Sequence, residues 1–205
     1  MKTILEDSFI RFPASGDAPG FHVARQSAKL HSVRLWGRLD PPWAGNLSLG
    51  LSLAGFNILG GFARRNRAER WAAEFLITPT PSAPLPGTLD LLALSRVAHP
   101  EAHPGPVELS HFALDGSPDH GAALFLEVRG PDRIGFLGSL LRSLAELRLS
   151  PQEMTLSTRN DEVSDRFLLR SLESELPTDA VRCALGRMLS EMLAPPTAPR
   201  VLGAG

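Results

Sequence analysis

The feature that most constrains this chain is an internal repeat in the order of its sequence patterns. Residues 31–118 and 122–205 each show a strand pattern, a helical pattern, two more strand patterns and a second helical pattern. Some residues recur at matching places: Asp40…Gly45 with Asp132…Gly135, Leu53-Ala54 with Leu144-Ala145, and Arg65-Asn66 with Arg159-Asn160. Internal repetition is strong evidence of architecture. The sequence therefore predicts an α+β chain of two similar modules, preceded by a segment of residues 1–30.

The second module has the clearer patterns. Apolar and polar residues alternate over 124–129, which predicts a half-buried strand. A tight Gly- and Pro-containing loop follows, and an apolar stripe from Phe136 to Leu147 predicts a helix. Residues 152–159 and 162–171 predict a hairpin, and Thr178 suits the N-cap of a last helix. The lone cysteine, Cys183, lies in that helix, where we expect a buried small apolar side chain.

The first module is predicted to contain the same elements in the same order. They are a strand at 31–39, a loop at 40–46, a helix at 47–56 ending near Gly55, strands at 57–66 and 70–78, a helix at 89–97 capped by Thr88, and a closing strand at 107–114. Gly60-Gly61 lies in mid-strand, where glycine allows a close approach of backbones.

The second module lacks an evident closing strand. Its tail contains Pro195, Pro196 and Pro199, which have no N–H to donate to a strand ladder. A spare strand pattern occurs at residues 4–12, so we expect this segment to complete the second module, either of the same chain or of a partner. Residues 21–30 would then be a second extended segment or a connector.

Composition sets the broad class. The chain has 205 residues, a formal net charge of −1 and 43% hydrophobic residues, which are ordinary values for a globular protein. The charge gives no general attraction to nucleic acid or anionic lipid. No signal peptide and no apolar run of about 20 residues is evident, so we expect a cytoplasmic protein without a membrane span. One cysteine excludes an internal disulfide.

The second module resembles the ACT domain family. The resemblance rests on Leu126-Glu127-Val128-Arg129-Gly130-Pro131-Asp132-Arg133-Ile134-Gly135-Phe136-Leu137, followed by Leu144-Ala145-Glu146-Leu147. Ile134 stands where the family usually has proline. The pairing of two modules is similar to the ACT pairs of glycine-cleavage-repressor-like regulators and of uridylyltransferases. The resemblance implies two ferredoxin-like βαββαβ modules, each a four-stranded antiparallel sheet with both helices on one face.

The resemblance also implies that the loop after the first strand binds an amino acid at a module interface. In the second module the candidate ligand-binding residues are Asp132, Arg133, Ile134, Gly135 and Phe136. Gly135 allows a tight turn, and the helix that follows presents free N–H groups to a carboxylate. Asp132 suits either a helix cap or a contact to the ligand ammonium, and both remain open.

In the first module the corresponding candidates are Asp40, Gly45 and Asn46, with Asn46 also a good N-cap. Other features favour structural roles. His99 and His103 have helical metal-ligand spacing, but Pro100 and Pro104 disfavour a helix, so no metal site is predicted. The Arg64–Arg67 run is most simply a solvated hairpin tip.

The sequence thus predicts a regulatory amino-acid-binding protein that forms a homodimer and signals to a protein partner. No catalytic residues, cofactor or metal are predicted, and we expect no enzyme. Two alternatives remain: a ligand-free protein–protein interaction module, and an enzyme of unknown type. A polar lining near Asp132 and Asp40 favours the sensor, whereas an apolar lining there favours the interaction module.

Overall fold

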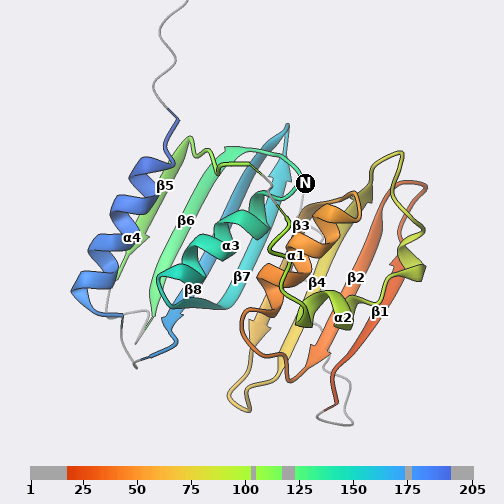
Figure 1. The fold of residues 1–205 in the computed structure, drawn as a ribbon, viewed down its shortest axis with the longest axis horizontal. Coiled ribbons are helices and arrows are strands. Elements are labelled where there is room, and N and C mark those ends of the chain that lie inside the picture. The colour runs from red at the N-terminus through yellow and green to blue at the C-terminus, as the bar shows by residue number, and fades with distance from the viewer. Residues whose placement is uncertain (1–17, 103–104, 117–122, 174–176, 195–205) are drawn as a thin grey trace, which may run out of the picture.

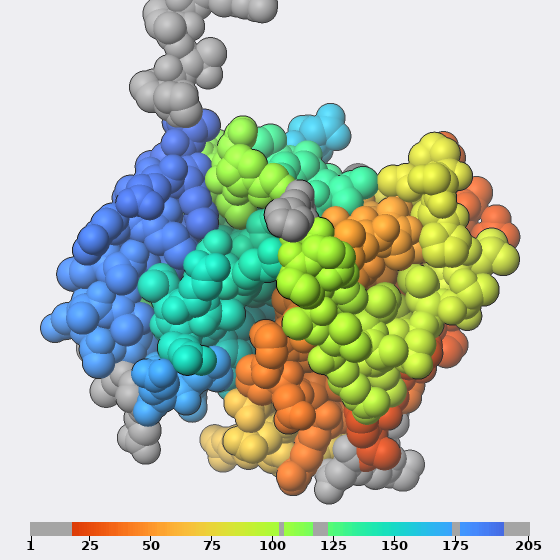
Figure 2. Space-filling model, viewed as in Figure 1, coloured from red at the N-terminus to blue at the C-terminus, as the bar shows by residue number. Residues whose placement is uncertain are grey.

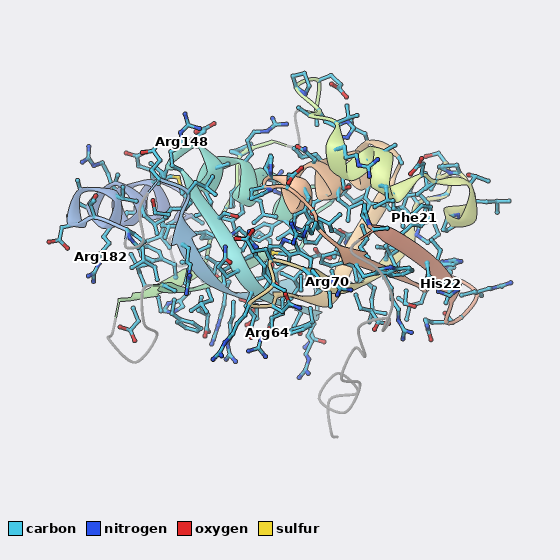
Figure 3. All side chains as sticks on the ribbon, turned by 90° about the horizontal axis from the view of Figure 1, so that it is seen from below. Phe21, His22, Arg64, Arg70, Arg148 and Arg182 are labelled. Atoms are coloured by element: carbon cyan, nitrogen blue, oxygen red, sulfur yellow. The ribbon has the colours of Figure 1, made fainter. Side chains whose placement is uncertain are left out.

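A computed structural model describes residues 18–102, 105–116, 123–173 and 177–194. Over these residues the chain forms a single antiparallel sheet of eight strands, with helices α1 to α4 covering one face (Figure 1). Figure 3 shows the same layers from the side, with Arg64 on the face away from the helices. No helix in the described part of the chain has both the length and the apolar character needed to cross a membrane.

The elements follow one another in the same order in both halves. The N-terminal half contains β1 (Gly20–Arg25), β2 (His31–Gly37), α1 (Trp43–Leu53), β3 (Phe56–Arg65), β4 (Trp71–Pro79), a short 3-10 helix η1 (Pro86–Thr88) and α2 (Leu91–Arg96). The C-terminal half contains β5 (His111–Asp115), β6 (Leu124–Pro131), α3 (Phe136–Glu146), β7 (Leu149–Arg159), β8 (Glu162–Ser171) and α4 (Asp179–Glu191). The order across the sheet is β1-β2-β4-β3-β7-β8-β6-β5.

The two edge strands differ from the sequence expectation. The strand predicted at 107–114 does not close the first half; it appears as β5 and pairs with β6 of the second half. In the first half the corresponding place is taken by β1, which pairs with β2 and overlaps the segment 21–30 that we expected to be extended or a connector. Residues 4–12 lie outside the described residues, and the place beside β6 that we expected them to fill is occupied by β5. Alternation predicts that a segment is a strand, but it does not predict the strand's partner.

Helix α1 begins earlier than predicted, at Trp43 and not at Leu47. Trp43 is 2% exposed and packs edge-on against Trp71, with ring centroids 5.1 Å apart. Gly45 and Asn46, expected in the loop, are therefore part of the helix. Pro42 precedes the first turn, where its missing N–H has no cost.

Two smaller expectations about the helices are also wrong. Helix α2 is capped by Asp90, whose carboxylate accepts a hydrogen bond of 3.0 Å from the Ala93 N–H, and not by Thr88. Cys183 is exposed, because α4 buries a narrower stripe than expected, at Leu185 and Leu189. Thr178 does cap α4, accepting from the Val181 N–H at 3.3 Å.

The β3–β7 pairing joins the two halves at the centre of the sheet. Its register runs from Gly60 opposite Ser157 to Arg64 opposite Glu153. Gly61 in this strand shows the close backbone approach that the sequence predicted, since a Cβ there would lie 2.5 Å from the Glu74 carbonyl oxygen. The apolar cores of the two halves form one continuous cluster beneath the helices.

Helices α1 and α3 pack against each other above this junction. Residues after α2 then cross the helix layer between them, as the yellow-green segment shows in Figure 2. Arg142 of α3 holds this segment by donating to the carbonyl oxygens of His99 at 2.7 Å and Ala102 at 3.0 Å. The two halves therefore contact each other both in the sheet, through β3 and β7, and in the helix layer, through α1 and α3.

Candidate functional site

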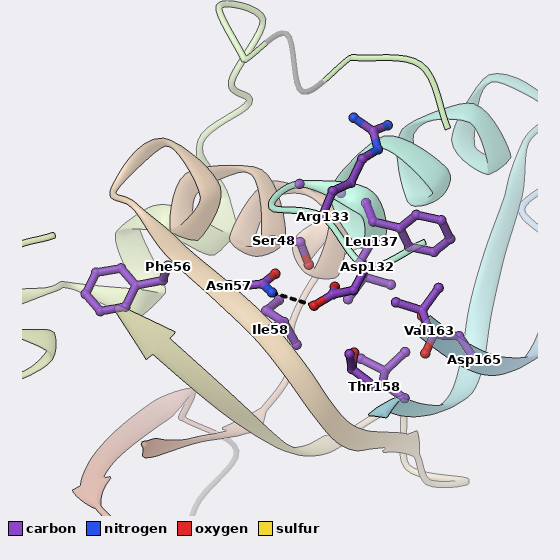
Figure 4. A pocket seen from close by; sticks show the side chains of 14 residues that line it. Ser48, Phe56, Asn57, Ile58, Asp132, Arg133, Leu137, Thr158, Val163 and Asp165 are labelled. Atoms are coloured by element: carbon purple, nitrogen blue, oxygen red, sulfur yellow. Dashed lines mark hydrogen bonds between the residues drawn. The ribbon is translucent and has the colours of Figure 1, made fainter. Parts of the chain in front are cut away.

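A polar cavity lies at the junction, between the N-terminus of α3 and the first residues of β3 (Figure 4). Its lining comes from both halves: Ser48, Phe56, Asn57 and Ile58 from the first, and Asp132, Arg133, Gly135, Phe136, Leu137, Gly138, Leu156, Thr158, Val163 and Asp165 from the second. The centre of a water molecule can be placed anywhere within a volume of about 20 Å³ inside the cavity. This volume holds about one water molecule. A larger guest requires the walls to move apart.

One hydrogen bond closes the cavity between the halves. The Asn57 side-chain amide, on β3, donates to Asp132 Oδ2 at 2.8 Å (Figure 4). The backbone N–H of Asp132 donates to the Asp161 carbonyl oxygen at 2.8 Å, which fixes the loop against the β7–β8 turn. The first of these bonds joins the two halves, whereas the second lies within the C-terminal half.

Asp132 does not cap helix α3. The N-cap is Gly135, which has φ of 88° and ψ of −1° and no side-chain cap. This left-handed conformation favours glycine. The first turn of α3 lines the cavity through Phe136, Leu137 and Gly138. The Phe136 N–H donates to the Arg133 carbonyl oxygen at 3.1 Å, and the next N–H groups have no intrahelical acceptor. Of the two alternatives for Asp132, capping is therefore wrong.

A second acid, Asp165, lies beneath Asp132 on strand β8. It is 4% exposed, and its Oδ1 accepts a hydrogen bond of 3.1 Å from the Ser157 N–H. Burial raises the pKa of the Asp165 carboxyl to about 7; the Ser157 bond opposes this shift and the Asp132 charge adds to it. Burial therefore favours the neutral form of this carboxyl.

The pKa of Asp132 is shifted in the same direction. Partial burial raises it, the hydrogen bond from Asn57 lowers it, and the nearby Asp161 charge raises it again. The cavity therefore holds two carboxyl groups whose pKa values are raised by burial and by a neighbouring acid, Asp132 for Asp165 and Asp161 for Asp132. A positive charge placed between them would relieve both effects.

The other predicted residues of this loop are not all directed at the cavity. Phe136 is buried and lines it. The Arg133 guanidinium turns away and donates to the carbonyl oxygens of Gly105, at 2.9 Å, and Pro106. Ile134 is 37% exposed and is not part of the lining. Arg133 thus holds the connector between the halves in place of contacting a ligand.

The first-module candidates lie elsewhere. Asp40 is exposed. The Asn46 amide donates to the Ser95 carbonyl oxygen at 3.3 Å, and Gly45 faces Leu141 of α3. Gly45 and Asn46 line a separate open hollow of about 410 Å³ against Ala98, His99 and Pro100. The structure does not bring these three residues together with Asp132.

The equivalent place in the other half is apolar. The spacing from Gly37, the last residue of β2, to Trp43 equals that from Gly130 to Phe136, so Leu39 and not Asp40 corresponds to Asp132. Leu35 pairs with Ala73 as Val128 pairs with Asp165, so Ala73 corresponds to Asp165. The small hollow there is lined mainly by apolar groups: Pro41, Pro42, Trp43, Ala44, Gly45, Trp71, Leu141, Ala145, Leu149, Ser150, Pro151 and Leu172.

Asn57 and Asp165 were missed by sequence reasoning. The sequence pattern could have indicated Asp165, because this acid stands on the inward face of an alternating strand, between Val163 and Phe167. No pattern indicates Asn57, since its role depends on how the two halves pair. In the same position of the second half stands Ser150.

A basic groove of about 290 Å³ lies at the β3–β4 hairpin tip predicted to be solvated. It is lined by Arg64, Arg65, Asn66, Arg67, Glu69, Gln152, Glu153, Leu168 and Arg170. Arg64 pairs with Glu153 at 3.3 Å and Arg65 with Glu69 at 3.1 Å, so acids offset part of its charge. Among the described residues no group of three or more His, Cys, Asp and Glu side chains is placed to hold a metal ion.

Comparison with known proteins gives little further identification. No protein-family model matches the chain, and no curated protein matches it significantly. Among solved structures, aspartate kinase from Synechocystis matches with a TM-score of 0.44 and 16% sequence identity. The match covers 80% of this chain and 27% of that chain. A similarity at this level assigns no family.

Proposed function

We propose that this chain is a regulatory binding protein for a small amino-acid ligand, built from two ACT-type modules that meet at the β3–β7 pairing. The observation that carries this proposal is the junction cavity, where Asn57 of one half bonds to Asp132 of the other at 2.8 Å. The resemblance of residues 124–147 to ACT domains supports the same placement of the ligand. The proposal is a binding function, with no catalysis and no cofactor.

The chemistry of the cavity fits a zwitterion. The N-terminus of α3 offers N–H groups and a partial positive charge to a carboxylate. Asp132 offers a carboxylate to an ammonium group, and Asn57 offers an amide that can donate and accept. An amino acid carries both complementary charges on one carbon, so it can satisfy both ends of the site at once.

Binding would be coupled to the junction between the halves. With about 20 Å³ of free space, the cavity admits an amino acid only if the Asn57–Asp132 bond opens or is exchanged for ligand contacts. The ligand would therefore have different affinities for the closed and the opened junction. Differential affinity for two states is the basis of regulation by a ligand. A protein partner would bind differently to the closed and the opened junction. We also propose that the chain works as a homodimer.

The groups around the cavity support binding in preference to catalysis. The Ser48 hydroxyl donates to the Ala44 carbonyl oxygen at 2.7 Å within helix α1, so its proton is engaged. An activated nucleophile needs a base within hydrogen-bond reach of its hydroxyl. The two acids lie on one side of the cavity, where they repel each other.

Thermal unfolding against the twenty amino acids at millimolar concentration tests the proposal. A ligand at 100 times its dissociation constant stabilises by about 2.7 kcal/mol, which shifts the Tm of a chain of this size by several degrees. We expect a shift with one amino acid or a few related ones, and its loss in Asp132→Ala. Asp40→Ala is the matched control, because Asp40 is an exposed acid in the corresponding loop, and it should retain the shift.

The ligand-free interaction module is the second candidate. The apolar lining of the equivalent hollow near Pro41 and Trp43 favours it, since a dry cleft packs modules together without binding a polar ligand. No thermal shift with any amino acid would favour this candidate and contradict the first, whereas a homodimer by sedimentation fits both.

A further inference from the structure

We propose that Asp165 contacts the ligand's ammonium group together with Asp132, so that the cavity selects amino compounds and releases a proton when it binds them. This inference rests on the proposed function and names the chemical group that the same site recognises. It is carried by the placement of Asp165 beneath the cavity.

Asp165 lies on the inward face of β8, between the buried side chains of Val163 and Phe167. It is 4% exposed and lines the cavity. Its one hydrogen bond among the described residues comes from the Ser157 N–H to Oδ1, so Oδ2 has no partner there. Oδ2 is not among the fully buried unpartnered side-chain atoms of the described residues, so a donor placed in the cavity can reach it.

The fold itself does not need an acid at this position. In the other half the same place in the sheet register holds Ala73, which is fully buried in the apolar core. Asp132 likewise corresponds to Leu39, which is 7% exposed. The positions that correspond to the two acids are therefore apolar in the N-terminal half. Both acids line one cavity.

No cation among the described residues balances the two acids. Asp132 is the charged group that acts on Asp165, and Asp161 acts in turn on Asp132. The first turn of helix α3, residues 136–139, carries no charged side chain, and Arg133 is directed to the connector. The charged neighbours on the strands, Glu127, Arg129 and Arg166, pair with one another on the opposite face of the sheet.

A proton on Asp165 is the simplest way for the empty cavity to limit this repulsion, and burial has raised the pKa of that carboxyl to about 7. A ligand ammonium can take the place of that proton. Its three N–H donors match three acceptors of the cavity: Asp132, the free oxygen of Asp165 and the Asn57 carbonyl oxygen.

The protonated Asp165 carboxyl loses its O–H proton to solvent, and the resulting carboxylate accepts an N–H of the ligand ammonium. No covalent bond to carbon changes. An analogue with a hydroxyl in place of the ammonium cannot replace the proton, so 2-hydroxy acids should not bind.

Titration calorimetry of the full chain tests this inference, using the amino acid that gives the largest thermal shift. At about pH 6.5, in two buffers of different ionisation enthalpy, wild type should release more than half a proton per ligand bound, since Asp165 is mostly protonated there. Affinity should fall by up to about tenfold per pH unit below pH 6. Asp165→Asn should release no proton and should weaken binding on the order of tenfold, the loss of a charged contact.

Glu191→Gln, an exposed acid on α4, is the matched control and should behave as wild type. Asparagine keeps an acceptor for the Ser157 N–H, so the variant should fold, and circular dichroism checks this. Binding of an amino acid without proton release, unchanged in Asp165→Asn, would overturn this inference and leave the proposed function standing. Equal binding of the matching 2-hydroxy acid would also overturn it. A flat response to every amino acid would overturn both.

Discussion

Gly138, in the first turn of α3, lies directly against Leu49 of α1. A methyl group at Gly138 would come within 2.7 Å of Leu49 Cδ2 and 3.1 Å of the Leu49 backbone nitrogen. The two helices can approach this closely only because position 138 has no side chain. The contact sets the distance between the halves directly above the candidate site.

Substitution of this glycine should separate the helices. We expect Gly138→Ala to destabilise the chain by about 1–3 kcal/mol, the usual cost of overpacking. Gly186→Ala is a matched control in helix α4, where an added methyl group would meet nothing within 4 Å. That variant should gain roughly 0.5–1 kcal/mol from better helix propensity. Urea unfolding of both variants measures the difference, and equal effects would contradict this description of the helix contact.

A double-mutant cycle on Asn57 and Asp132 should reveal coupling between the halves. The bond from the Asn57 amide to a carboxylate is half-buried, so we expect a coupling free energy of about 1 kcal/mol in Asn57→Ala, Asp132→Ala and the double variant. The free energies of unfolding in urea supply the four values. Strict additivity of the two single effects would show that the bond contributes nothing to the junction.

Stability should depend on pH through Asp165. Its pKa in the folded state, about 7, lies above the ordinary value of about 3.9. The folded state therefore binds more protons than the unfolded state between these values, and stability must fall as pH rises from about 4 to 7 and then level off. The full effect is at most about 4 kcal/mol.

Asp165→Asn removes this dependence because its side chain does not titrate. At pH 8 we expect its Tm to exceed that of wild type by several degrees, with little difference near pH 4. Asp132 contributes a weaker slope of the same sign, since its pKa is also raised. A wild-type Tm that rises between pH 5 and 7 and is unaffected by Asp165→Asn would contradict the assignment.

Arg133 should stabilise the connector and not the ligand. Its guanidinium donates to the carbonyl oxygens of Gly105 and Pro106. In Arg133→Ala we expect faster hydrogen exchange over residues 105–110, with any ligand-induced thermal shift retained. If Arg133→Ala abolished the ligand-induced thermal shift and left hydrogen exchange over residues 105–110 unchanged, Arg133 would be a ligand-binding residue.

The sequence predicted the elements of the second half well because their patterns are local. The alternation over 124–129, the stripe from Phe136 and the cap at Thr178 each correspond to an observed element. The predicted start of α1 at Leu47 is wrong because Pro41 and Pro42 suit a loop, yet proline is also well tolerated just before a helix, which here begins at Trp43.

The partners of strands and the second wall of the site could not be predicted in this way. Whether β5 pairs with β2 or β6 depends on contacts distant in sequence, which periodicity does not encode. The same holds for Asn57, which meets Asp132 only because β3 pairs with β7. Of the predicted binding residues, Asp132, Arg133, Gly135 and Phe136 line the junction cavity, whereas Ile134, Asp40, Gly45 and Asn46 do not.

The N-terminal half has Leu39 and Ala73 at the positions that correspond to Asp132 and Asp165. This difference affects how the fraction of bound protein depends on ligand concentration. A symmetric pair of modules would offer two equivalent sites across one junction, and occupation of one could favour the other. This chain keeps the polar groups at one end of the junction alone. On the proposed function, each chain therefore takes up one ligand, with a hyperbolic saturation curve and a Hill coefficient of about one unless separate chains communicate.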